Sequence, residues 1–166
     1  MSTLTEQRVT APQRWPRRVS VVAGGMMLGG AALNTVLVTT RPEVYAELGT
    51  WFADLSPWPL GPLAQLWEAT FADHPRVWGT VIGIGYEGTV GMLVLSRDPR
   101  RRLLGLGGVA LFKSGLLAMG LWSWAVPWLA VLVPTAAATT RAATARNRHP
   151  SRRATTRGQL NGRRFP

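Results

Sequence analysis

The two residues of this sequence best placed to do chemistry are the two charges inside its long apolar stretches. Glu87 is the only charged residue between positions 77 and 96, and Lys113 is the only one between positions 103 and 140. Each costs about 2.5–3.5 kcal/mol at the centre of a membrane helix. A charged side chain that is kept in a membrane helix despite this cost forms a pair with an opposite charge, contacts a ligand or carries a proton.

A stripe of small residues indicates which way Glu87 points. Three glycines lie at intervals of four around it, which brings them to one side of a helix. Small residues let membrane helices approach closely, so this side should pack against a neighbouring helix and Glu87 should point inward. The residues of the stripe are Gly79, Gly83, Glu87 and Gly91.

Counting from the basic residues between the two stretches places both charges at a similar depth. Glu87 lies ten residues before Arg97, and Lys113 lies eleven residues after Arg102. At 1.5 Å per residue, both are about 15–16 Å from the edge of the membrane. The two helices should be antiparallel neighbours joined by a short loop, so we expect the two side chains to meet near the middle of the membrane.

Three uses of these charges remain open. The first is an ion pair that fixes the register of the two helices. The second is a ligand or quinone site formed by Glu87 and Lys113, together with Tyr86 and with Asn34 from the first apolar stretch. The third is a path for protons or for a transported molecule.

Composition removes most other chemistry. The chain has 166 residues, of which 46% are hydrophobic and 16% are charged, with no cysteine and two histidines. Disulfides, thiolate nucleophiles and cysteine-based metal sites are therefore excluded. No carboxylate pair, catalytic triad or phosphate-binding loop is visible, so we assign no catalytic residue and no metal site, and the sequence favours a protein that is not an enzyme.

Apolar runs long enough to cross a bilayer must position these residues. Residues 19–40 and 77–96 each approach the roughly 20 residues that a spanning helix needs. The run 103–140 would be about 57 Å long as one helix, so it must fold back. We expect the break between residues 120 and 127, with Pro127 opening the next helix.

The third helix has a typical start, with Asp98 as its cap and Pro99 at its first position. Tryptophans fall at the predicted outer ends, where an aromatic belt would lie. These tryptophans are Trp78, Trp122, Trp124 and Trp128. The predicted spans are 19–40, 77–96, 100–121 and 126–144.

The basic residues determine the orientation. The net charge is +11, and Lys113 is the only one of the 19 basic residues that is not arginine. Four arginines precede the first run, four lie in residues 97–102 and eight follow Thr140, whereas residues 41–76 hold two arginines and five acids. The positive-inside rule then places both termini and the middle loop in the cytoplasm, which requires an even number of spans. This pattern favours a protein of the cytoplasmic membrane over a nucleic-acid binder.

The segments outside the spans have distinct characters. Residues 41–76 contain two stretches with apolar residues at helical spacing, separated by prolines and a glycine. We expect two short amphipathic helices, either a lid over a site open to the outer leaflet or a packed connector. Residues 1–18 are a basic cytoplasmic segment. Residues 145–166 should be a disordered, arginine-rich tail attracted to anionic lipid at about 1 kcal/mol per arginine.

The stretch from residue 75 to residue 117 carries a recognisable motif. Pro75 precedes a helix with the pattern G-x-x-x-E-x-x-x-G, formed by Gly83, Glu87 and Gly91, and a basic loop and a glycine-rich helix follow. In these features the chain resembles the middle of DoxX-like membrane proteins, which are small four-helix bundles. The first helix departs from that pattern. The resemblance implies an association with membrane redox enzymes or quinones.

These observations predict an all-α, integral membrane four-helix bundle with a short helical outer segment between spans one and two. We expect a non-catalytic membrane subunit or scaffold of a redox or cell-envelope complex, with the bilayer and another membrane protein as its partners. The alternative is a small-molecule or quinone-binding or transport protein with its site at Glu87 and Lys113. The residues themselves identify no cofactor, and quinone enters through the resemblance alone.

Overall fold

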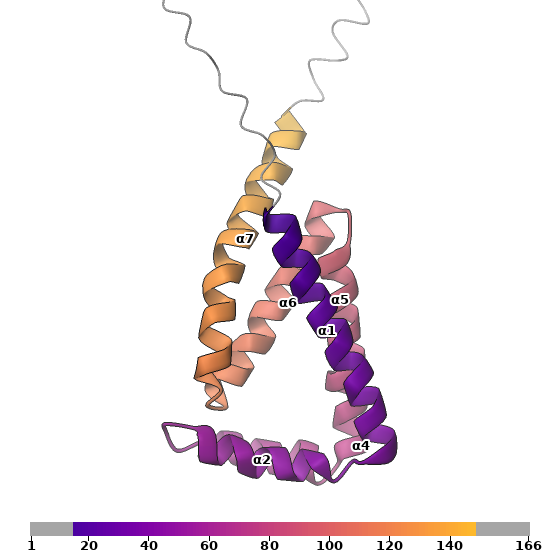
Figure 1. The fold of residues 1–166 in the computed structure, drawn as a ribbon, viewed down its shortest axis with the longest axis vertical. Helices are drawn as coiled ribbons and strands as arrows, with labels where there is room; N and C mark the ends of the chain where they lie inside the picture. The colour runs from indigo at the N-terminus through magenta and orange to yellow at the C-terminus, as the bar shows by residue number, and fades with distance from the viewer. Residues whose placement is uncertain (1–14, 149–166) are drawn as a thin grey trace, which may run out of the picture.

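The computed structural model describes residues 15–148, and all regular structure in that range is helical (Figure 1). The predicted all-α class is therefore confirmed for this part of the chain. Most of the predicted N-terminal segment and residues 149–166 of the predicted tail lie outside the described residues. The elements are α1 (Trp15–Thr40), α2 (Val44–Leu55), α3 (Pro62–Trp67), the π-helix η1 (Glu68–Ala72), α4 (Pro75–Trp78), the π-helix η2 (Gly79–Tyr86), α5 (Glu87–Leu95), α6 (Pro99–Ala118) and α7 (Trp122–Arg148).

Four long helical stretches lie side by side along the molecule. α4, η2 and α5 follow one another without a break from Pro75 to Leu95. α1 packs along η2 and α5, α5 packs against α6, and α6 packs against α7. In Figure 1, α7 lies on the left and α1 and α5 lie on the right, while α6 runs from the top of α5 to the lower end of α7. The pair α6 and α7 separates from the pair α1 and α5 toward α2. The buried core between them consists of Ala23, Met27, Val90, Val94, Leu106, Val109 and Leu132.

Two of these stretches are long and apolar enough to cross a membrane, Trp15–Thr40 and Pro75–Leu95. They coincide with the first two predicted spans. α6 and α7 occupy the positions of the third and fourth, with 20 and 27 residues. Large apolar side chains are exposed on all four, among them Val36, Met92, Leu104, Leu111 and Val133. Apolar surface of this extent is typical of a protein that meets lipid or a partner.

Both ends of α6 have a local cause. The side chain of Asp98 accepts a hydrogen bond of 3.1 Å from the backbone N–H of Arg100, and Pro99 occupies the first turn, so the predicted helix start is confirmed. At the other end Gly120 has a φ of 90°. The N–H groups of Gly120 and Leu121 donate to the carbonyls of Leu117 and Leu116. These are the two bonds of a Schellman motif, in which glycine adopts the left-handed conformation at little cost.

The prediction that Pro127 opens the last helix is wrong. α7 begins at Trp122, directly after the turn at Gly120, and Pro127 and Pro134 both lie inside it. The left-handed glycine completes the reversal within three residues, so no further loop is needed. Each of these prolines lacks an N–H and leaves one carbonyl of the preceding turn without its helical donor.

The predicted boundary of the tail at residue 145 is also wrong, because α7 continues to Arg148. The residues beyond 144 are alanine, arginine and asparagine, and alanine and arginine are among the best helix formers.

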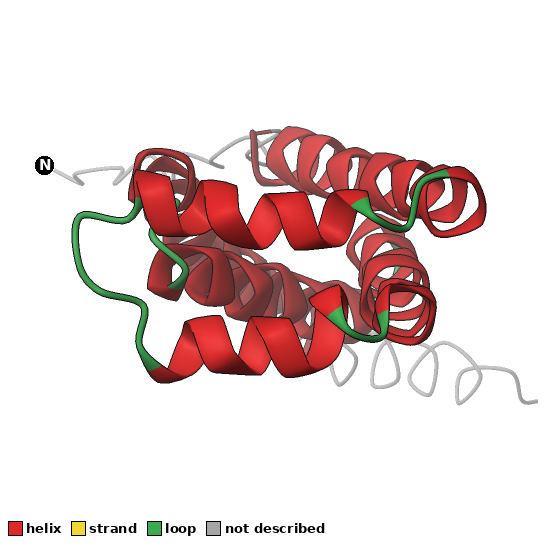
Figure 2. Cartoon of the chain, turned by 90° about the horizontal axis from the view of Figure 1, so that it is seen from below, coloured by secondary structure: helices red, strands yellow, loops and turns green. Residues whose placement is uncertain are grey.

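The outer segment forms the two short helices that the sequence predicts. Figure 2 shows them side by side across the ends of the long helices, with α2 on one side and α3 with η1 on the other. Aromatic rings hold them together: the ring centroids of Phe52 and Trp67 are 5.0 Å apart, and those of Tyr45 and Phe71 are 5.8 Å apart. The indole N–H of Trp67 donates to the carbonyl of Tyr45 at 2.8 Å.

The loop between α2 and α3 is attached to the turn between α6 and α7. The indole N–H of Trp58 donates to the carbonyl of Ala118 at 3.2 Å. Gly120 lies so close to Ser56 that a Cβ at residue 120 would come within 2.5 Å of the Cβ of Ser56. The outer helices therefore connect the two pairs of long helices at this end of the molecule.

Candidate functional site

Glu87 points inward, as the stripe of small residues predicts, but the helix that it faces is α1. A Cβ at Gly79 would meet Val38, and one at Gly83 would meet Asn34 at 2.5 Å. Further along the stripe, a Cβ at Gly91 would come within 3.1 Å of the backbone oxygen of Gly24. The whole stripe is therefore the surface on which α1 packs, and Glu87 is 7% exposed within it.

A hydrogen-bonded chain links Glu87 to the outer segment. The side-chain amide of Asn34 donates to Oε1 of Glu87 at 3.4 Å and to the carbonyl of Gly30 at 3.0 Å. The hydroxyl of Tyr45, on α2, donates to Oδ1 of Asn34 at 2.6 Å. Three polar side chains from α1, α2 and α5 thus form one network, Tyr45–Asn34–Glu87.

Glycine makes room for the carboxyl group. A Cβ at Gly30 would overlap Oε2 of Glu87. Glu87 is also the first residue of α5, directly after the eight-residue π-helix η2. π-helical turns are rare and are frequent at functional sites.

The predicted ion pair between Glu87 and Lys113 does not form. Within the described residues, side chains closer than 4.0 Å form two ion pairs, Arg41–Glu43 at 3.3 Å and Arg101–Asp98 at 3.9 Å. The reason is rotational. Counting residues from the membrane edge gives the height of a side chain along its helix, whereas the direction in which it points depends on packing. Glu87 faces α1, and Lys113 lies against rings that come from α6 and α7.

Lys113 is 2% exposed, and three aromatic rings surround its ammonium group. Nζ is 5.4 Å from the ring centroid of Phe112, 5.3 Å from that of Trp124 and 5.8 Å from that of Trp128. All three distances are within the range of cation–π attraction. We call this group the aromatic cage. Trp124 and Trp128, which the sequence assigns to an aromatic belt, form two of its walls.

The structure divides the predicted site residues into two groups. Asn34, predicted as a companion of Glu87, is its direct hydrogen-bond partner. Tyr86 instead donates its hydroxyl to the carbonyl of Gly108 on α6 at 2.8 Å, and its ring lies 6.4 Å from that of Phe112. Tyr86 therefore lies on the side of Lys113, and Asn34 on the side of Glu87.

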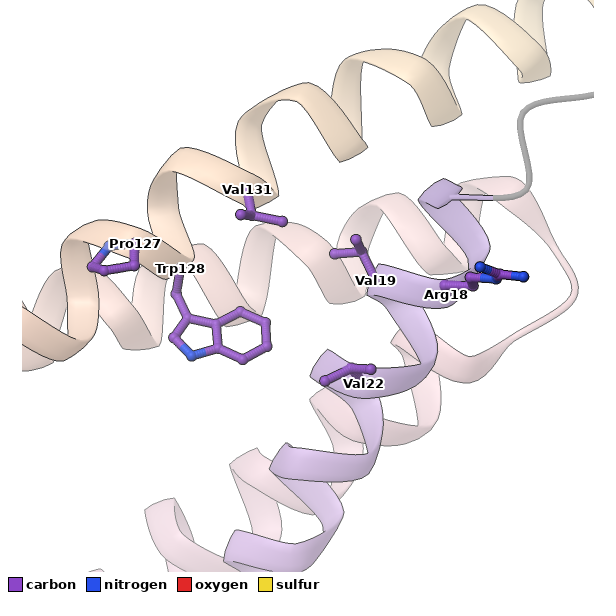
Figure 3. Close-up of a pocket in the computed structure, with 6 residues that line it drawn as sticks. All are labelled: Arg18, Val19, Val22, Pro127, Trp128 and Val131. Atoms are coloured by element: carbon purple, nitrogen blue, oxygen red, sulfur yellow. The ribbon is translucent and has the colours of Figure 1, made fainter.

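Apolar pockets adjoin the aromatic cage. One pocket has a volume of about 340 Å³ and lies between α1 and α7, where Val19 and Val22 face Pro127, Trp128 and Val131 and Arg18 lies at the edge (Figure 3). Another, of about 480 Å³, lies between α3 with η1 and the helices η2 and α6. Trp128 lines the first pocket and Phe112 lines the second, so each pocket is bounded by a ring of the cage.

Sequence reasoning missed Tyr45 as a member of the site. Tyr45 is 3% exposed, and its burial, together with the nearby charge of Glu87, raises the pKa of its hydroxyl above the ordinary value. The available signal was a large side chain with a hydroxyl group in the first turn of a predicted amphipathic helix. Its hydroxyl reaches Asn34 on α1 because α2 lies across the ends of the long helices.

The arrangement holds two buried groups that can bind. The carboxyl of Glu87 and the ammonium of Lys113 are an acceptor and a donor of opposite charge, each in an apolar surrounding. Within residues 15–148 no three His, Asp or Glu side chains are grouped to hold a metal ion. Chemically, these groups can hold a proton, bind an ion or orient a polar group of a ligand.

Comparison of the chain with protein-family models, with curated proteins and with solved structures gives no match. The resemblance of residues 75–117 to DoxX-like proteins therefore stays a prediction.

Proposed function

We propose that this protein is a four-span protein of the cytoplasmic membrane with both termini in the cytoplasm. Two helices of sufficient length and apolarity support it. α6 and α7 pack beside them, and 20 residues of α-helix cover about 30 Å, the thickness of the hydrocarbon core. Arginines gather at the ends of helices that would face the cytoplasm.

We further propose that the protein binds an amphipathic small molecule in the apolar pockets beside the aromatic cage, with the two buried charges, Lys113 and Glu87, as its polar contacts. The observation that carries this proposal is that both residues are buried without forming an ion pair. A charge in a membrane helix is expensive unless it is paired or used. A purely structural role favours direct pairing, whereas a binding role keeps the two charges apart, each held by neutral neighbours that a ligand can replace.

The chemistry of the two groups defines what such a ligand carries. The carboxyl of Glu87 accepts hydrogen bonds or binds a cation, and the aromatic cage holds Lys113 as a donor to a carbonyl or an anion. Pockets bounded by Phe112 and Trp128 suit apolar parts of the molecule. A quinone, which the DoxX-like resemblance implies, has two carbonyl groups and an apolar tail and is one ligand to look for.

Purification in mild detergent tests the binding proposal. Small molecules extracted from the full-length protein are identified by mass spectrometry for the wild type, Glu87→Gln and Lys113→Met. Ser114→Ala is the matched control, because Ser114 is exposed, is next to Lys113 and bonds only to its own helix at Ala110. We expect a molecule that is retained by the wild type and the control and is depleted in both site variants. An unchanged profile in folded site variants contradicts the proposal.

A second candidate is a non-catalytic membrane subunit or scaffold, and one observation favours it. Gly25 and Gly29 lie four apart on an exposed side of α1, and a Cβ on either would meet nothing within 4 Å. Small residues at this spacing form close helix–helix contacts in membranes. A stoichiometric protein partner in the same purification, lost on Gly25→Leu but retained in Glu87→Gln, would support this candidate over the binding function.

A further inference from the structure

An apolar pocket of about 480 Å³ lies beneath the outer helices, apart from the Glu87 network. Leu66 and Phe71 form its wall on the side of α3 and η1. Tyr86 of η2 and Phe112 and Met119 of α6 form the wall on the side of the long helices. The pocket therefore lies between the outer helices and the long helices, two parts of the chain that the outer loops connect.

Most of the polar groups that line this pocket already form hydrogen bonds within the protein. Thr70 donates its hydroxyl to the carbonyl of Leu66, Tyr86 donates to Gly108, and the indole of Trp67 donates to Tyr45. Trp78, at the outer end of the second long helix, contributes a further indole N–H. An apolar cavity with few free polar groups takes up apolar molecules rather than water.

Exposed apolar side chains flank the pocket. Leu66 is 60% exposed and Leu111 is 68% exposed, and both also line it. If the long helices cross a membrane as proposed above, these exposed leucines at the pocket face the hydrocarbon of the outer half of the bilayer. Trp78 then lies at the membrane–water interface, where tryptophan is favoured.

We propose that this pocket binds the acyl chain of a membrane lipid that enters sideways from the outer leaflet. The inference rests on the proposed membrane orientation but does not require a ligand at Glu87. The outer helices then act as one wall of a lipid site, in addition to connecting the two helix pairs.

One residue allows the pocket to be filled without disturbing the fold. Gly115 lines the pocket, and a Cβ there would meet nothing within 4 Å. Gly115→Phe, with Gly115→Leu as a smaller replacement, should occupy the space that the acyl chain takes. Gly107→Phe is the matched control, because Gly107 is on the same helix, is equally open and does not line the pocket.

The test uses vesicles of phosphatidylcholine and phosphatidylglycerol in which some phosphatidylcholine carries a photoactivatable diazirine on its acyl chain. The full-length protein is inserted and illuminated, and labelled residues are mapped by peptide mass spectrometry. We expect labels on Phe71, Phe112 or Met119 in the wild type and in Gly107→Phe, and their loss in Gly115→Phe and Gly115→Leu. Labels on the outward-facing Leu33 and Val36 should persist in every variant.

Three alternative results would overturn the proposal, each for a different reason. Labels on Leu33 and Val36 without labels in the pocket show that the pocket does not admit lipid. Pocket labels that survive in both Gly115 variants, with melting temperatures like that of the wild type, show that the label reaches these residues by another route. Release of the protein by carbonate, with no labelling anywhere, contradicts the membrane orientation itself.

Discussion

Glu87 and Lys113 are stabilised by neutral groups of different kinds. The carboxyl of Glu87 receives a hydrogen bond from the amide of Asn34, which accepts in turn from Tyr45. The ammonium of Lys113 lies against three ring faces, which attract a cation through their quadrupoles. Neither group depends on direct contact with the other.

This arrangement predicts weak energetic coupling between the two charges. Glu87→Gln, Lys113→Met and the double variant should change the free energy of unfolding almost additively, with a coupling energy below about 1 kcal/mol. Breaking one side of a buried, hydrogen-bonded ion pair costs about 3–5 kcal/mol in soluble proteins. Thermal or chemical unfolding in one detergent measures the cycle. Recovery of most of the loss in the double variant would show direct pairing after all.

Tyr45 should make the stability of the folded protein depend on pH in the alkaline range. Burial and the charge of Glu87 raise the pKa of Tyr45, so the folded state keeps its proton to higher pH than the unfolded state does. The stability that protonated Tyr45 contributes is therefore complete below about pH 10, the ordinary tyrosine pKa, and declines as pH rises through the higher folded value.

Absorbance of tyrosinate measures this shift directly. The chain has two tyrosines, so Tyr86→Phe leaves Tyr45 as the only one that titrates. We expect a midpoint above about pH 10 in the folded protein and an ordinary midpoint after denaturation. A folded midpoint at or below the ordinary value would mean that the hydroxyl of Tyr45 is open to water rather than bonded to Asn34.

At the scale of elements, α1 presents glycines to two different surroundings. Gly30 faces α5 and makes room for the carboxyl of Glu87, whereas its neighbour Gly29 faces outward. Gly30→Ala should therefore destabilise the protein by about 1–3 kcal/mol, as overpacking does. Gly29→Ala should be neutral or stabilise it by up to about 1 kcal/mol, because alanine favours helix. The free energies of unfolding of both variants are measured in the same detergent. Equal changes in the two variants would contradict the packing of α1 on α5.

Helix positions were largely predictable because apolar runs, caps and prolines act locally. Asp98 and Pro99 start α6 as predicted, and the two outer helices follow from helical spacing of their apolar residues. The site was less predictable because it depends on rotation of one helix against another. Depth along the helices placed Glu87 and Lys113 at one level, but packing turned Glu87 to Asn34 and brought Lys113 against the rings of Trp124 and Trp128.

For the whole molecule, the distribution of arginine predicts the orientation in the membrane. A reporter fused after Pro166 should be cytoplasmic, and one inserted after Gly61, in the loop before α3, should be outside. Gly61 is exposed and has a φ of 48°, so an insertion there falls in a turn. Two reporters, one active only in the cytoplasm and one active only outside the membrane, assign each position to a side. Export of the C-terminal reporter would require an odd number of spans.

The bond between Trp58 and Ala118 has a consequence for the order of events during synthesis. The two residues are 60 positions apart in the chain. At about 5–20 residues per second, Ala118 is made about 3–12 s after Trp58. α2 and α3 are therefore complete before the turn that anchors the loop between them is made. A chain that stops before residue 118 lacks the carbonyl that Trp58 binds, so the later half of the protein completes the folding of the earlier one.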